Sequence, residues 1–120
     1  MTWLPWLIIG GAALAVIVLK RLALVRPDVA RSWLKQGAMV IDVRSEREFR
    51  EGHLPGAINI PYERLRDELP RRAADKDQAL LLHCLSGGRS QIAKGTAKNM
   101  GYRYAFNLGS YRRAAKIVTG

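Results

Sequence analysis

The sequence predicts an α/β domain with a small, mostly parallel sheet flanked by helices, preceded by one transmembrane helix. After residue 26, short apolar runs alternate with segments of helical periodicity, which is the pattern of strands joined by crossover helices. Before residue 20 the chain has no Lys, Arg, Asp or Glu, although its 120 residues include 20 basic and 10 acidic side chains. The single cysteine excludes an intramolecular disulfide framework. No Cys/His cluster suggests a zinc site, so we expect neither a metal nor a cofactor, and packing must stabilise the domain.

The apolar segment from Trp3 to Leu19 predicts the membrane span. As a helix it rises about 26 Å, against a hydrocarbon core of roughly 30 Å. Residues 22–25 extend the apolar stretch, while Lys20 and Arg21 reach toward the headgroups. Trp3 and Trp6 suit the aromatic belt at the opposite interface. We therefore expect residues 3–25 to contact membrane lipid.

The basic residues around this segment predict its orientation. A cleaved signal peptide is disfavoured because no basic side chain precedes the apolar run. Lys20, Arg21 and Arg26 all flank its C-terminal end, which places the rest of the chain in the cytoplasm by the positive-inside rule. The expected organisation is an anchor with its flanking segment over residues 1–25 and one α/β domain over residues 26–120.

The first elements of the domain follow from start and stop signals. Pro27 and Asp28 begin a helix that ends near Gly37, and the apolar run at residues 38–43 predicts a buried strand. Ser45-x-x-Glu48 has the form of a capping box, so a short helix follows Arg44 and ends by Gly52.

The remaining elements continue the alternation. After the Pro55-Gly56 turn, residues 57–60 predict a second strand, and residues 62–69 predict a surface helix before a polar loop at 71–78. A third strand, a helix, a fourth strand and a last helix are expected at residues 79–83, 90–100, 102–107 and 111–118.

Cys84 is the candidate nucleophile. It follows the third predicted strand, and in an open α/β sheet binding sites lie beyond the carboxyl ends of the strands. Gly87 and Gly88 allow the next loop to curl so that its backbone N–H groups point inward at a helix N-terminus. With Arg89 nearby, this arrangement favours the thiolate over the thiol. The alternative, a small buried core cysteine, does not explain the Gly-Gly-Arg-Ser sequence that follows it.

The two histidines have structural interpretations. His83 is adjacent to Cys84 on a strand, so its ring should face the opposite side, and we expect it to serve packing. His53 precedes the Pro55-Gly56 turn and is expected to organise that loop by hydrogen bonding.

Two motifs, in this order, make the chain resemble the rhodanese family of sulfurtransferases over about residues 27–110. They are Ile41-Asp42-Val43-Arg44-Ser45-x-x-Glu48-Phe49-x-x-Gly52-His53-Leu54-Pro55-Gly56-Ala57-Ile58-Asn59-Ile60-Pro61 and the loop Cys84-x-Ser86-Gly87-x-Arg89-Ser90.

The resemblance implies a small parallel-sheet domain in which Cys84 takes a sulfane sulfur from a small anionic donor such as thiosulfate. A thiol or cyanide then removes the sulfur from the Cys84 persulfide. By position, the backbone of Leu85, Ser86, Gly87, Gly88, Arg89 and Ser90 cradles the outer sulfur, and Arg89 binds the donor. Asp42 and Arg44 would help build the pocket wall or form a purely structural ion pair.

Two features bear on related chemistries. Phosphatases and arsenate reductases that resemble this fold use a Cys-x5-Arg loop, whereas Cys84-x4-Arg89 is one residue shorter and favours sulfur. A reductase would also need an external thiol, because the chain has no second cysteine.

After the last strand, residues 107–111 lack the second Gly and the Trp that the family often has there. This departure bears on the packing of the last helix and leaves open a catalytically weak binding module.

The charge is unevenly distributed. Residues 78–120 contain seven basic residues and no acidic one. This half can focus an anionic donor toward the loop, attract anionic lipid, or form an ordinary solvated surface. No aromatic-interleaved basic motif points to nucleic acid. The sequence thus favours a membrane-tethered sulfurtransferase, with a membrane-bound regulatory module and a phosphatase or arsenate reductase as alternatives.

Overall fold

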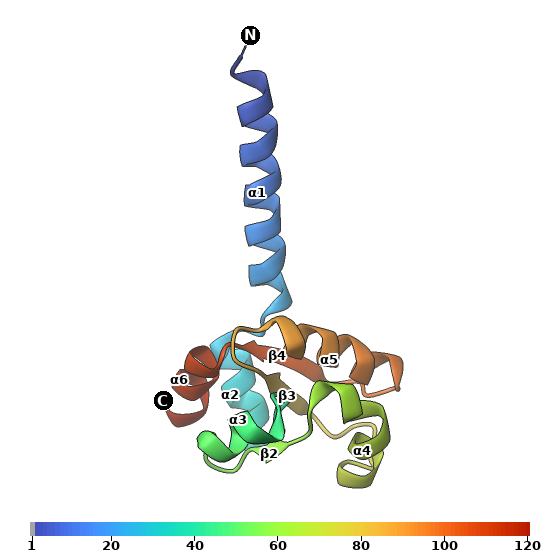
Figure 1. Cartoon of the computed structure of the whole chain (residues 1–120). Coiled ribbons are helices and arrows are strands. Elements are labelled where there is room, and N and C mark those ends of the chain that lie inside the picture. The colour runs from blue at the N-terminus through green and yellow to red at the C-terminus, as the bar shows by residue number, and fades with distance from the viewer. Residues whose placement is uncertain (1) are drawn as a thin grey trace.

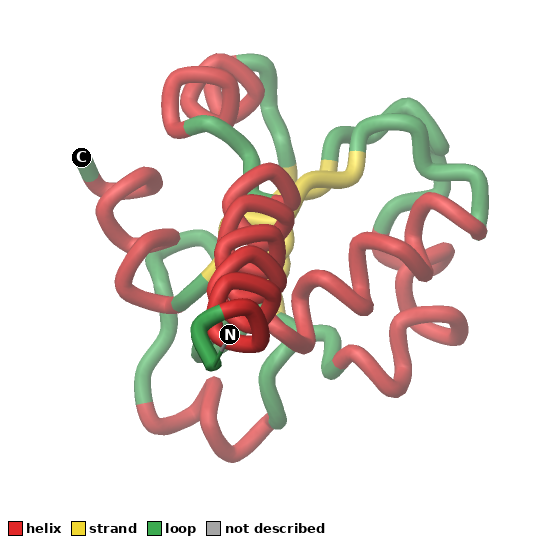
Figure 2. The backbone as a smooth tube through the Cα atoms, turned by 90° about the horizontal axis from the view of Figure 1, so that it is seen from above, coloured by secondary structure: helices red, strands yellow, loops and turns green. Residues whose placement is uncertain are grey.

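The computed structural model describes residues 2–120, apart from the side chains of residues 20–22. The strands form one parallel sheet in the order β2-β1-β3-β4, with helices on both sides (Figures 1 and 2). This arrangement confirms the predicted α/β class. The elements are α1 (Leu4–Ala23), α2 (Pro27–Lys35), β1 (Met39–Asp42), α3 (Glu46–Glu51), β2 (Ile58–Asn59), the 3-10 helix η1 (Tyr62–Arg64), α4 (Leu65–Arg72), β3 (Leu80–His83), α5 (Gly88–Asn99), β4 (Ala105–Gly109) and α6 (Tyr111–Thr119).

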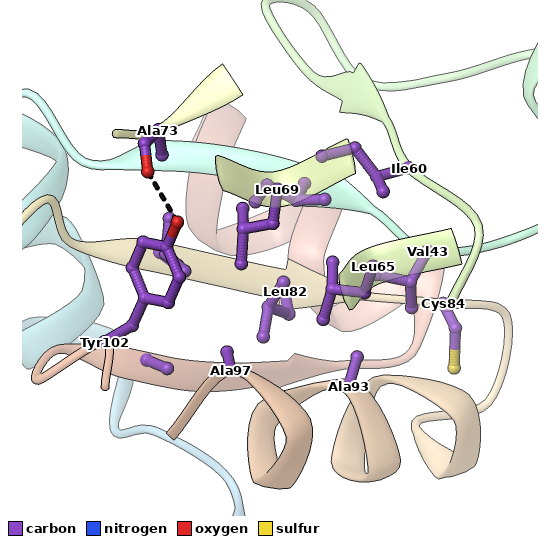
Figure 3. Packing of buried hydrophobic residues seen from close by; sticks show 13 residues of the cluster. Val43, Ile60, Leu65, Leu69, Ala73, Leu82, Cys84, Ala93, Ala97 and Tyr102 are labelled. Atoms are coloured by element: carbon purple, nitrogen blue, oxygen red, sulfur yellow. Dashed lines mark hydrogen bonds between the residues drawn. The ribbon is translucent and has the colours of Figure 1, made fainter. Parts of the chain in front are cut away.

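The sheet separates two hydrophobic cores. Successive side chains of a strand point to opposite faces, so Leu80 and Leu82 enter one core and Leu81 enters the other. The first core packs against α4 and α5, and Figure 3 shows its side chains. The second packs against α2 and α6. Because both faces are covered, β3 reads as a continuous apolar run, and all four of its residues are buried.

Three element boundaries differ from the sequence prediction. The helix expected at residues 62–69 is the short η1 followed by α4, which extends to Arg72. β4 begins at Ala105 and not at Tyr102, because residues 102 and 103 bond to other segments. The Tyr102 N–H donates to Ala97 O, the Arg103 N–H donates to Lys76 O, and the Tyr102 hydroxyl donates to Ala73 O at 2.5 Å (Figure 3). α5 begins two residues earlier than predicted, at Gly88.

The last helix packs although the residues before it depart from the family pattern. Ser110 caps α6, its side chain accepting a hydrogen bond from the Arg113 N–H at 3.1 Å. Ala114 and Ile117 are buried against the sheet. The departure therefore leaves α6 in place.

The N-terminal segment is a helix that projects away from the domain (Figure 1). The expected membrane-spanning helix is not supported, because no helix in the described part of the chain is long and apolar enough to cross a bilayer. Two of the residues that were expected to lengthen the span fold with the domain: Val25 is buried in the second core, and Leu24 pairs with Asn107. The expected headgroup contacts of Lys20 and Arg21 lie outside the described side chains. The cytoplasmic orientation and the division at residue 25 stay predictions.

Candidate active site around Cys84

Cys84 lies directly after β3, where the carboxyl ends of the strands meet. Its N–H donates to Gly109 O at 3.2 Å, which ties the start of the loop to the end of β4. The thiol is buried, and Figure 3 places its sulfur at the end of the first core, beside α5. Gly87 has φ +101°, and its N–H donates to the Cys84 Sγ at 3.0 Å. The predicted curled loop is therefore present, and a positive φ explains the glycine at position 87.

The loop stabilises the thiolate of Cys84. Burial alone would raise the pKa of this thiol, but hydrogen bonds from the Ser90 hydroxyl and the N–H groups of Ser90, Gly87 and Ser86 outweigh it. The pKa of Cys84 is therefore lower than that of an ordinary thiol. Ser90 Oγ lies 3.5 Å from the Cys84 Sγ and 2.7 Å from Oδ1 of Asn107. The thiol is thus prepared for nucleophilic attack without a general base.

Arg89 lies at the start of α5 and forms an ion pair with α3. Its two terminal nitrogens donate to the two carboxylate oxygens of Glu48, at 2.6 and 3.0 Å. Glu48 also completes the predicted capping box, accepting a hydrogen bond from the Ser45 N–H at 3.1 Å. The hydrogen bond from Arg89 is the main reason that the pKa of Glu48 is lowered to about 2, and burial acts in the opposite direction. The resemblance predicted that Arg89 binds the donor, which stays a prediction, and nothing in the sequence indicated this carboxylate partner.

Asp42 and Arg44 form a buried ion pair behind the loop. Arg44 donates to Asp42 at 2.7–3.0 Å from its side chain and also to Gly52 O at 2.7 Å. The Arg44 guanidinium lies 4.7 Å from the centre of the Tyr111 ring. Only Arg44 borders a hollow; Asp42 is fully buried. The pair therefore has the structural role that the sequence left open, and Arg44 also forms part of the wall.

Two hollows adjoin the active loop. The first, of about 410 Å³, is lined by Arg44, Glu48, Glu51, Gly52, Leu85 and Tyr111. The second, of about 440 Å³, is lined by Ala23, Leu24, Ser86, Gly87, Gly88, Gln91 and Asn107. Leu85 is 58% exposed, so this apolar side chain lies at the surface beside the first hollow and not in the core. Both hollows border residues of the active loop, whereas the buried Cys84 itself lines neither of them.

Both histidines lie where the sequence placed them. His83 is fully buried, and its ring packs against that of Tyr111 in a T-shaped arrangement. Burial lowers the pKa of His83 despite the nearby Asp42 carboxylate. Its Nε2 has no hydrogen-bond partner and lies 3.9 Å from the Asp42 carboxylate. His53 stacks on Phe49 and its Nδ1 lies 2.9 Å from Phe49 O. Within residues 2–120, no group of three or more His, Cys, Asp or Glu side chains is arranged to hold a metal ion.

Sequence reasoning missed three residues of this site. Asn107 accepts hydrogen bonds from Ser90 and Gly109, and it donates to Gly87 O at 3.3 Å. A signal was available, since Asn107 is a polar residue at the carboxyl end of the strand predicted at residues 102–107. Tyr111 and Glu48 had no such signal, because their contacts join segments far apart in the sequence.

The comparisons with known proteins identify the family. The rhodanese-like domain matches residues 26–114. The chain belongs to the rhodanese-like domain family. It is 32% identical over 75 residues to the thiosulfate sulfurtransferase PspE of Escherichia coli K12, covering 62% of this chain and 72% of PspE. It is 30% identical over 82 residues to the thiosulfate sulfurtransferase GlpE of Pseudomonas fluorescens, covering 68% of this chain and 73% of GlpE.

Solved structures agree with this assignment. The human single-domain sulfurtransferase TSTD1 superimposes with a TM-score of 0.66 at 30% identity, covering 78% of this chain and 96% of TSTD1. A rhodanese from E. coli, solved with anions, gives a TM-score of 0.62 at 30% identity, covering 64% of this chain and 91% of that protein. The predicted rhodanese-like fold and the thiosulfate sulfurtransferase-like class of the protein are therefore confirmed at the level of the family.

Proposed function

We propose that the protein is a sulfurtransferase that moves a sulfane sulfur through a persulfide on Cys84. The observation that carries the proposal is the environment of the Cys84 Sγ. The sulfur accepts a hydrogen bond from the Gly87 N–H at 3.0 Å and has a lowered pKa although it is buried. The relatives PspE and GlpE are both named thiosulfate sulfurtransferases, which supports thiosulfate as the donor.

The chemistry proceeds in two balanced displacements. The Cys84 thiolate attacks the outer sulfur of thiosulfate, a new S–S bond forms, and sulfite leaves with the electron pair of the broken S–S bond. A nucleophilic acceptor, cyanide or a thiolate, then attacks the outer sulfur of the persulfide. Thiocyanate or a new persulfide is released, and the Cys84 thiolate is regenerated.

The loop supplies the electrostatic stabilisation that both steps need. In each step the Cys84 Sγ carries negative charge, as the attacking thiolate or as the leaving thiolate, and the N–H groups of Ser86, Gly87 and Ser90 are directed at this sulfur. Preorganised donors of this kind stabilise developing charge without reorganisation during the reaction. The two hollows that border the loop offer room for the donor and the acceptor.

Mass spectrometry after incubation with thiosulfate tests the proposal. The native chain should gain one sulfur atom on Cys84, and cyanide should remove it with release of thiocyanate. Cys84→Ser should fold normally but show neither reaction, because a hydroxyl does not form a persulfide. Sulfur transfer by Cys84→Ser at the native rate would refute the proposal.

A binding or regulatory module is the second candidate. The ion pair between Arg89 and Glu48 favours it, because both terminal nitrogens of the side chain expected to bind the donor already donate to a carboxylate. A folded native chain that gains no sulfur from thiosulfate, and that produces no thiocyanate, would support this second function over the first.

A further inference from the structure

Glu48 connects two parts of the structure that the sequence treats separately. Its carboxylate accepts hydrogen bonds from Ser45, which caps α3, and from Arg89, which lies 41 residues later in the active loop. The pairing with Arg89 is bidentate and short, at 2.6 and 3.0 Å. Ion pairs with this fork geometry are among the stronger ones in proteins. A capping residue that served α3 alone would not need a contact with Arg89.

The pairing changes the electrostatics of the pocket. Arg89 is the basic residue of the active loop, and Glu48 places a full negative charge against it. The side chains are only 31% and 28% exposed, so solvent screens the pair less than a surface pair. The other ionisable groups around the loop are the mutually paired Asp42 and Arg44, His83 with its lowered pKa, Tyr111, Glu51 and Arg113. None of these forms a hydrogen bond with Arg89 or Glu48 in the described structure.

We propose that Glu48 is a positioning and specificity residue that holds Arg89 beside the Cys84 pocket and cancels its charge. The proposal rests on the proposed sulfur transfer. It differs from the expectation that Arg89 binds the donor anion with its free charge. The donor anion is then held mainly by the N–H groups of the loop. A pocket without an uncompensated cation binds dianionic donors with moderate affinity and releases an anionic product readily.

The pair offers a test in which charge and structure give different results. Glu48→Gln removes the charge but keeps an acceptor, and glutamine also completes a capping box, so α3 should keep its N-terminus. Glu46→Gln is a matched control. Glu46 belongs to the first turn of the same helix and pairs with Arg64 at 2.6 Å, outside the active loop.

The first readout is the pKa of Cys84, measured from the pH dependence of alkylation by the neutral reagent iodoacetamide. Glu48→Gln should lower this pKa by about half a unit to one unit, because a negative charge near the thiolate is removed. Arg89→Gln should raise it by a similar amount. The double variant should return close to the native value, since the pocket is again without net charge from this pair. Glu46→Gln should leave it unchanged.

The second readout is the KM for thiosulfate. Glu48→Gln should lower it about two- to fivefold, because Arg89 gains an uncompensated charge that attracts the dianion. Glu46→Gln should not change it. Circular dichroism and thermal melts establish that each variant is folded. If Glu48→Gln does not fold, the comparison of Arg89→Gln with the double variant tests the pair, because the Cys84 pKa must be higher in Arg89→Gln, which keeps the Glu48 charge.

Three results would overturn the proposal. The first is a Cys84 pKa that shifts in the same direction in both single variants, and the second is a double variant whose Cys84 pKa departs from the native value by more than either single variant. The third is a Cys84 pKa in Glu48→Gln equal to the native one. The alkylation readout needs no sulfur transfer, so a failure of the proposed function remains distinguishable. In that event the two single variants would still shift the Cys84 pKa in opposite directions, while thiosulfate would add no sulfur to Cys84.

Discussion

Replacing Asp42 with asparagine should strongly destabilise the domain. Asp42 is fully buried at the end of β1 and accepts hydrogen bonds from both the backbone and the side chain of Arg44. Asp42→Asn retains the size of the side chain and one carbonyl oxygen. It removes the negative charge, so the guanidinium of Arg44, whose residue is only 6% exposed, loses its counter-charge.

The cost follows from that burial. Removing one partner of a buried ion pair costs about 3–5 kcal/mol, because the other charge is left uncompensated. Arg44 keeps its hydrogen bond to Gly52 O and its contact with the Tyr111 ring, so we expect the lower end, about 3 kcal/mol. For a domain of this size, 1 kcal/mol corresponds to about 4–8 °C in Tm, and the expected decrease is therefore at least about 12 °C.

Thermal unfolding followed by circular dichroism measures this effect. Glu51→Gln is the control, since it breaks the exposed pair with Arg47 and should cost at most about 0.5 kcal/mol. The double variant Asp42→Asn/Arg44→Met should be more stable than Asp42→Asn, because it removes the uncompensated charge as well. A decrease in Tm for Asp42→Asn as small as that of the control would refute the reasoning.

Two further predictions concern the active loop and its ion pair. Because the pKa of Glu48 is held at about 2, below its ordinary value of 4.5, the stability that this carboxylate contributes is present above about pH 5 and lost as the pH falls toward 2. Urea unfolding at pH 7 and pH 3 should show a larger loss of stability in the native chain than in Glu48→Gln, by an amount on the order of 1–2 kcal/mol. Gly87→Ala places a side chain at φ +101° and 3.4 Å from Gly109 Cα, so it should cost about 1–2 kcal/mol and slow alkylation of Cys84. Gly88→Ala meets no neighbouring atom within 4 Å, and an unfolding free energy as low as that of Gly87→Ala would contradict the strain argument.

The sequence predicted the features that depend on local pattern. The apolar runs around Ile41 and Leu82 predicted β1 and β3, because strands covered on both faces need apolar side chains throughout. The position of Cys84 and the glycines after it predicted the active loop, because both depend on the strand end and on a positive φ. Each of these features depends on residues that are close together in the sequence, so the sequence alone indicates it.

The parts that escaped prediction depend on contacts between distant segments. Glu48 satisfied a local motif, so nothing in the sequence indicated that the same carboxylate would also pair with Arg89. Leu24 and Val25 continue an apolar run and were therefore assigned to the membrane segment. In the structure they pack against the domain, because β4 offers them a backbone partner at Asn107.

That backbone pairing also protects the sheet against association with other chains. An edge strand exposes unpaired N–H and C=O groups that can template pairing with another strand. At the β4 edge, the Val25 N–H donates to Asn107 O at 2.9 Å, so the chain covers part of this edge itself. At the other edge, β2 is only two residues long. The domain thus limits strand-to-strand aggregation by covering one edge of its sheet and shortening the other.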